Sequence, residues 1–291
     1  MDKSYDITMI GPVAHDITQF EGTEERSLGG AVFFSSAAAA RSGAQVLVVT
    51  KCSEQDRIQD SQMEQPGVSV QIIDSRCTTS AVNAYHSADR EKRTITLVSR
   101  SDAFAVHEIP SVETRIIHIA GLFAGDCPDT LIEAADQVAD VALDVQGVLR
   151  AATASGIVFR DWALKERYLP HIRYLKADAA EAEIMSGTSN REHAGRMFCE
   201  MGADEVMITR SDEVMLVHAG KTHRAPLRPN NLSGRTGRGD TCFAAYLARR
   251  QSHSIQESLD YAAALVSMKM ESPGAFHGTM GDVERRMMSA E

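Results

Sequence analysis

The sequence of 291 residues predicts an α/β fold, a three-layer sandwich with a central, mostly parallel sheet and a small β-sheet lid. Strand-like and helix-like segments alternate over most of the chain, which favours parallel strands joined by helices that cover both faces of the sheet. Between about residues 68 and 100 the pattern changes to short alternating segments rich in Val, Thr and Ile. Such a change is typical of antiparallel hairpins, so we expect it to form the lid.

The first third of the chain supplies a strand, a loop, a helix and a second strand. A strand is expected in YDITMIGPVAHDI; the pair Gly29 and Gly30 then opens an alanine-rich helix that ends near Gly43, before the strand QVLVVT. The segments VSVQIID, SAVNAYHSA and RTITLVS supply the predicted hairpins. We therefore expect one domain over residues 1–291, with a lid formed mainly by about residues 12–30 and 68–104.

From Arg115 onward strands and helices alternate again. The expected elements are the strand RIIHIAGL, a helix near PDTLIEAADQVA, the strands DVALDVQG and IRYLKAD, a helix near AAEAEIMSG, and the strand EVMITRS. The segment DEVMLVHAGKTHRAPL adds a meander, and two long alanine-rich helices follow. No internal repeat or Pro/Gly-rich linker divides the chain, which supports a single domain.

Composition argues against several classes of protein. The net charge of -10, from 30 Lys and Arg against 40 Asp and Glu, disfavours a protein that binds the backbone of nucleic acids. No apolar run is long enough to cross a bilayer and no secretion signal is visible, so we expect a cytoplasmic protein without membrane contact. The five cysteines are widely spaced without a metal-ligand pattern, which favours reduced thiols.

The stretch NLSGRTGRGDTCFAAYLARR contains the strongest candidate for chemistry. Gly237, Arg238, Gly239 and Asp240 precede an apolar run with helical spacing, so the glycines are expected at a helix N-terminus, where free N–H groups and the helix dipole bind anions. Asp240 could accept a proton from a hydroxyl nucleophile, and together these features indicate phosphoryl transfer to an alcohol. Taken alone, the same motif also fits an ordinary turn with a helix-capping acid. It is neither a Walker A loop nor a dinucleotide fingerprint.

Several motifs along the chain resemble, in the same order, the ribokinase-like (phosphofructokinase-B type) family of carbohydrate and nucleoside kinases. The matching segments are IGPVAHD, GGAVFFSSAAAARSGA, KADAAEAEIMSG, MITRSDEVML and RTGRGDTCFAAYLARR, followed by AAALVSMKMESPGA. Together they extend over about 270 residues. The resemblance implies the ribokinase-like fold and an enzyme that transfers phosphate to an alcohol group.

The resemblance also implies roles for individual residues. Asp240 matches the catalytic base, and Gly237, Arg238 and Gly239 match the loop that forms the anion hole. Asp16 and the pair Gly29 and Gly30 match positions that bind substrate hydroxyls. Asp178 and Glu181 match a motif associated with Mg²⁺ and phosphate, with Asp in place of its usual Asn. The positions expected to bind ATP are Thr209, Ala263, Ala264 and Gly274.

Four departures from the family pattern concern the predicted site. Phe34 stands where the family usually has a sugar-binding Asn, and either core packing or an apolar wall against the substrate explains it. Arg238 replaces an alanine; we hypothesise that its guanidinium reaches phosphate oxygens, against the alternative of surface charge. Gly234 replaces an Asp of the family's monovalent-cation site, which puts activation by K⁺ in doubt. Ser211 replaces the glycine of a nucleotide-binding segment.

One further segment, LDVQGVLR, is similar to inositol-kinase-like members of the family. In it Asp144 and Gln146 could bind hydroxyls and Arg150 could bind an anion, although a structural turn explains the segment nearly as well.

We therefore expect an ATP- and Mg²⁺-dependent kinase that phosphorylates a small sugar, a sugar alcohol or an inositol-like polyol. A nucleoside ranks second as acceptor and a phosphorylated sugar third. A catalytically idle sugar or nucleotide sensor on the same fold is the alternative from another class. An open sheet edge in the lid favours a homodimer.

Overall fold

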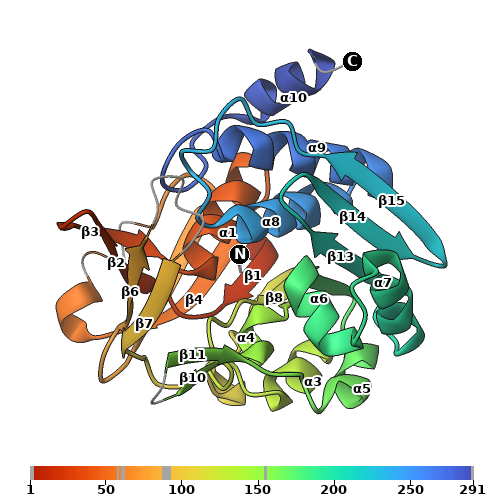
Figure 1. Ribbon diagram of the computed structural model, residues 1–291. Coiled ribbons are helices and arrows are strands. Elements are labelled where there is room, and N and C mark those ends of the chain that lie inside the picture. Colours follow the sequence, from red (N-terminus) through yellow and green to blue (C-terminus); the bar gives the residue numbers. More distant parts are fainter. Residues whose placement is uncertain (1–2, 58, 60–62, 87–92, 154–155, 290–291) are drawn as a thin grey trace.

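The computed structural model describes residues 3–57, 59, 63–86, 93–153 and 156–289 (Figure 1). Within them a nine-stranded sheet lies between two layers of helices, and a separate four-stranded sheet lies beside it. The predicted fold class is confirmed. Among the described residues, no helix is long and apolar enough to cross a membrane.

The large sheet has the strand order β15-β14-β13-β12-β9-β8-β1-β4-β5. The strands from β13 to β5 in this order pair in parallel, whereas β14 and β15 form the predicted antiparallel meander at one edge. Their bounds are β1 Ser4–Ile10, β4 Val46–Cys52, β5 Val68–Asp74, β8 Glu113–Ile119, β9 Asp140–Asp144, β12 Tyr174–Asp178, β13 Glu205–Thr209, β14 Glu213–His218 and β15 Lys221–Pro226.

Helices cover both faces of this sheet, and each face has its own core. On β4, Val46 and Val48 point into one core while Leu47 and Val49 point into the other, so the first half of the strand is a continuous apolar run. One layer contains α1 Ala31–Arg41, α8 Arg238–Arg250, α9 Ile255–Lys269 and α10 Met280–Met288. The other contains α3 Thr130–Asp136, α4 Gln146–Leu149, α5 Lys165–Tyr168, α6 Ala179–Ser186 and α7 Arg191–Glu200. In the described part of the chain, short 3₁₀ turns are η1 Glu54–Asp56, η2 Val106–Glu108 and η3 Leu169–His171.

The small sheet forms the predicted lid, with the strand order β3-β2-β6-β7. Its strands are β2 Ala14–Phe20, β3 Thr23–Gly29, β6 Thr79–Tyr85 and β7 Arg93–Ser99. A hairpin of β10 Arg150–Thr153 and β11 Gly156–Phe159 contacts β7 (Figure 1).

One segment expected in the lid belongs to the large sheet instead. The strand β5, residues 68–74, pairs in parallel with β4 at the sheet edge. An edge strand is only partly covered, so polar Ser69 and Gln71 alternate with apolar Val68, Val70 and Ile72. That alternation is the pattern of a half-buried antiparallel strand, and it misled the prediction.

Candidate active site

A cavity of about 600 Å³ lies between the lid and the carboxyl ends of the central strands. Ligands of open α/β sheets bind at this edge of the sheet. The predicted site residues that line it are Asp16, Gly30, Phe34, Gln146, Asp178, Glu181, Thr209, Gly237, Arg238, Gly239 and Asp240. The predicted residues that do not line it are Gly29, Asp144, Ala263, Ala264 and Gly274.

The glycine loop opens α8 as the sequence predicted. Gly237 is the N-cap, with a left-handed φ of 76° that disfavours any side chain. A Cβ at this position would lie 2.2 Å from the ring of Phe34, so the loop closes directly onto that ring. Phe34 therefore packs beneath the loop and also lines the cavity, so both explanations considered for it remain open.

Asp240 lies in the first turn of α8 and faces the cavity. Burial and the nearby charge of Asp144 raise the pKa of Asp240 to about 6, while Lys176 opposes the shift. The carboxyl is therefore mostly ionised at neutral pH and can accept a proton. Ser35 of α1 donates a hydrogen bond of 3.3 Å to the backbone oxygen of Asp240, which joins the two helix starts.

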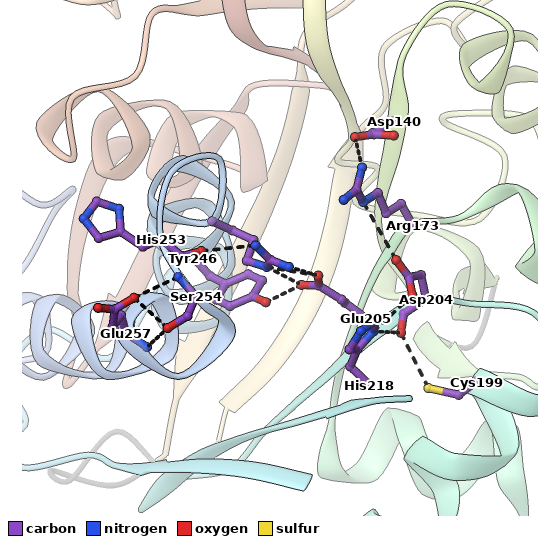
Figure 2. Close-up of polar contacts among 11 residues, drawn as sticks. Asp140, Arg173, Cys199, Asp204, Glu205, His218, Tyr246, His253, Ser254 and Glu257 are labelled. Carbon is purple, nitrogen blue, oxygen red and sulfur yellow. Dashed lines mark hydrogen bonds and ion pairs between the residues drawn. The ribbon is translucent and has the colours of Figure 1, made fainter. Parts of the chain in front are cut away.

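The opposite end of α8 is anchored to the large sheet (Figure 2). Arg250 pairs at 3.0 Å with Glu205 of β13, and the hydroxyl of Tyr246 donates a hydrogen bond to the same carboxylate. Glu205 also lies near Asp204 and His218 in a grouping that could suit a metal ion. Because Arg250 and Tyr246 already bind the carboxylate of Glu205, we assign the cluster a structural role that fixes the direction of α8.

Lys176 is a site residue that sequence reasoning missed. It lies on β12, lines the cavity, and its Nζ is 2.9 Å from Asp144 Oδ2 and 3.8 Å from Glu181 Oε2. Burial alone would lower the pKa of Lys176, but the carboxylates of Asp144 and Glu181 raise it above its ordinary value. A Cβ on Gly239 would lie 3.0 Å from the Nζ, so a charged ammonium lies directly against the glycine loop.

Asp144 holds this lysine and does not face the cavity. It is 2% exposed, and its carboxylate accepts hydrogen bonds from Lys176 Nζ and from the backbone N–H of Gln146. The structure therefore places Asp144 behind the site, whereas its neighbour Gln146 lines it.

Asp178 and Glu181 form a capping box at the start of α6. Asp178 Oδ1 accepts from the Glu181 N–H, and Glu181 Oε2 accepts from the Asp178 N–H. Burial raises the pKa of Glu181 to about 7 despite the nearby charge of Lys176. Both residues also line the cavity, and carboxylate oxygens beside room for water suit Mg²⁺, so the pair fits the predicted metal role.

The lid contributes a hydrogen-bonded pair of polar side chains to the cavity lining. Asn83 of β6 donates a hydrogen bond of 3.3 Å to Asp16 of β2, and both residues line the cavity. A Cβ on Gly29 would lie 2.1 Å from Asp16 Oδ2, so this glycine makes room for the carboxylate. Sequence reasoning missed Asn83, although an amide within a strand is an available signal.

Several cationic side chains line the same cavity as the glycine loop. Arg150, Lys176, Arg235 and Arg238 all line the cavity, although the chain as a whole carries a net charge of -10. Burial and the neighbouring Arg235 lower the pKa of Arg238. These cations can pair with anionic groups of a ligand, although carboxylates line the same cavity.

Of the residues predicted to bind a nucleotide, one lines this cavity and three do not. Thr209, at the end of β13, lines the cavity. Ala263 is 2% exposed within the core of α9, Ala264 is half-buried, and Gly274 is exposed on the loop after α9.

Comparisons with known proteins agree with this geometry. A family model described as pfkB family carbohydrate kinase matches residues 4–279. A search of curated proteins found no match. One solved structure, a pyrophosphate-dependent kinase in the ribokinase family complexed with a pyrophosphate analog and myo-inositol, is 32% identical with a TM-score of 0.88, covering 96% of this chain and 99% of that one.

Two other solved structures define the range of similarity. A pyrophosphate-dependent myo-inositol-1 kinase converted into a myo-inositol-3 kinase is 31% identical with a TM-score of 0.88, covering 98% of this chain and 99% of that one. The ribokinase of Arabidopsis thaliana, complexed with ribose and ATP, is 19% identical with a TM-score of 0.76, and the match covers 98% of this chain and 99% of that one. At this identity the similarity supports the fold alone. The chain belongs to the pfkB family of carbohydrate kinases and is a phosphotransferase with an alcohol group as acceptor.

Proposed function

We propose that this kinase transfers a phosphoryl group from inorganic pyrophosphate to a hydroxyl of an inositol-like polyol. The observation that carries the proposal is that polar groups for a polyol and positive charges for a phosphate come from different elements around the cavity. Asp16 and Asn83 offer hydrogen bonds on the lid side, whereas Lys176, Arg238 and the glycine loop offer positive charge on the other. Three solved structures that are 31–33% identical to this chain are of pyrophosphate-dependent kinases, which supports this donor.

In the proposed reaction, a polyol oxygen attacks the terminal phosphorus and the bond to the leaving phosphate breaks. Asp240 accepts the hydroxyl proton, which it later releases to solvent. The N–H groups of the glycine loop and the ammonium of Lys176 stabilise the charge on the transferred group. Mg²⁺ held by Asp178 and Glu181 would neutralise phosphate charge. The lid excludes water, which limits hydrolysis of the donor.

ATP, the donor expected from the sequence, is the second candidate. Thr209, one of its predicted contacts, lines the cavity, which favours ATP. The residues expected beside the adenine do not line it, because Ala263 is within the core and Gly274 is on an exposed loop. Pyrophosphate needs no such wall, so we rank it first.

A matrix of donors and acceptors tests the proposal. Pyrophosphate and ATP, each with Mg²⁺, are combined with inositols, sugar alcohols, sugars and nucleosides, and phosphorylated products are detected by ³¹P NMR. We expect turnover with pyrophosphate and an inositol. Turnover with ATP but not with pyrophosphate would refute pyrophosphate as the donor. A phosphorylated nucleoside as the product would refute an inositol as the acceptor. Ligand binding without turnover in any combination would favour the idle sensor. Asp240→Asn is the matched inactive control.

We also propose that two copies of the chain pair through the lid. Strand β3 is an edge of the small sheet, and its residues Thr23–Ser27 are exposed. An exposed edge offers unpaired backbone groups to a second strand. Light scattering after size exclusion should give the mass of a dimer, and a proline in β3, such as Glu25→Pro, should yield monomers.

A further inference from the structure

Lys269, the last residue of α9, is a buried cation that the reaction described above does not use. Its side chain is 1% exposed. Its Nζ donates hydrogen bonds of 2.5 Å to the carbonyl oxygens of Gly234 and of Thr236. Among the described residues, no carboxylate forms an ion pair with this ammonium within 4 Å, although the charge of Asp240 at longer range partly offsets the effect of burial on its pKa. A buried charge is costly, so its position requires a physical explanation.

The two carbonyl groups belong to the segment that leads into the glycine loop. The same segment is tied to the end of α9 by a 2.8 Å hydrogen bond from the Gly234 N–H to the Met270 oxygen. A Cβ on Gly234 would lie 1.7 Å from the Ser272 oxygen, so the segment packs closely against the residues that follow α9. Lys269 is therefore the charged part of a clamp that sets where Gly237 begins α8.

The surroundings of this ammonium are those of a bound monovalent cation. Backbone carbonyl oxygens replace the hydration shell of such ions in proteins. The Nζ also lies 5.4 Å from the ring centre of Phe34, the ring onto which Gly237 closes, and aromatic faces attract cations. Within one small region, carbonyl dipoles and a ring hold a positive charge beneath the anion-binding loop.

We propose that the ammonium of Lys269 acts as a built-in monovalent cation that positions the glycine loop, so that catalysis needs no added K⁺. It is a positioning residue, because it acts through the carbonyl groups of Gly234 and Thr236. The inference rests on the proposed role of the glycine loop in phosphoryl transfer. Gly234 stands where the family often has an Asp of its monovalent-cation site, so this segment lacks that carboxylate. Its absence is consistent with the proposal.

The first test measures the wild-type enzyme in buffers whose cation is either K⁺ or tetramethylammonium, at equal ionic strength. We expect the same kcat in both, and a requirement for K⁺ would overturn the proposal. The second test compares two variants of equal charge. Lys269→Ala leaves a space that a small cation can enter, whereas Lys269→Met fills it.

Both variants should lose at least about tenfold in kcat, because misplacement of the loop weakens transition-state contacts while KM for the polyol changes little. K⁺, NH₄⁺ or methylammonium should restore Lys269→Ala and leave Lys269→Met unchanged. Full activity of Lys269→Met, or a folded Lys269→Ala that no cation restores, would contradict the proposal. Lys221→Met, on an exposed strand, is the control for loss of a lysine charge.

Calorimetric binding of inorganic pyrophosphate separates this inference from the proposed reaction. If no acceptor is turned over, the wild type is still expected to bind pyrophosphate equally well with K⁺ or tetramethylammonium. Lys269→Ala should then bind it more weakly and recover when NH₄⁺ is added. Equal binding by Lys269→Ala without added cation would refute the inference. Thermal melting establishes which variants fold. If neither Lys269 variant folds, the comparison of wild-type kcat in K⁺ and in tetramethylammonium tests the proposal.

Discussion

Lys176→Met removes the ammonium that contacts the glycine loop while keeping most of the side-chain volume. The change leaves the carboxylates of Asp144 and Glu181, which are 2% and 4% exposed, without their cation. Loss of one partner from a buried pair costs about 3–5 kcal/mol in the free energy of unfolding. Loss of one charge that stabilises the transferred phosphate should lower kcat by about 10²–10³.

A second substitution separates these two effects. The double variant Lys176→Met with Asp144→Asn also lacks the buried carboxylate that Lys176 neutralises. Compared with Lys176→Met alone, it should therefore regain most of the lost free energy of unfolding, while kcat stays low. Urea denaturation measures the free energy of unfolding, and steady-state kinetics measures kcat. Recovery of kcat in the double variant would show that Lys176 only neutralises Asp144. An unchanged kcat in Lys176→Met would refute any catalytic role.

Three other predictions concern the same cavity. Because burial raises the pKa of Asp240 from 3.8 to about 6, kcat/KM should be maximal above pH 6 and should fall as the pH drops through 6. Asp144→Asn removes a nearby negative charge, so this fall should move to lower pH. If kcat/KM of the wild type falls only near pH 4, the assignment of Asp240 as the base is contradicted. Arg238→Ala should lower kcat by about tenfold or more if its guanidinium reaches phosphate oxygens, and unchanged kinetics would reduce it to surface charge. Asn83→Leu removes an amide that contacts Asp16, so KM for the polyol should rise by about tenfold, with a changed distribution of phosphorylated positions in the ³¹P NMR spectrum.

The fold and the centre of the site could be predicted because their signals are local. Alternating strands and helices define the large sheet, and the glycines before Asp240 define a helix start whatever surrounds it. The order of motifs then supplied the relation between Asp16, Asp178 and Asp240. In the structure these residues line one cavity, although about 220 residues separate the first from the last.

The charged contacts beneath the site could not be predicted in the same way. Lys176 lies in an apolar strand and Lys269 in an apolar helix, where a single lysine gives no indication of its partner. The partner of Lys176 is 32 residues away in sequence, and the partners of Lys269 are backbone oxygens, which no residue type reveals. Asp144 was assigned to substrate for a similar reason, since sequence does not show that a lysine from the next strand covers it.

The balance of charge in the cavity bears on how a donor enters. Among the described residues, four carboxylates and four cationic groups line it, and these are Asp16, Asp178, Glu181, Asp240, Arg150, Lys176, Arg235 and Arg238. Lys269 lies behind the loop and Asp144 behind Lys176, so the charges beneath the cavity also offset each other. A donor with several negative charges would therefore leave the cavity strongly negative if it entered alone. Because such an excess is costly in a half-enclosed space, we expect a divalent cation to accompany the donor, and we propose that Asp178 and Glu181 would hold that cation.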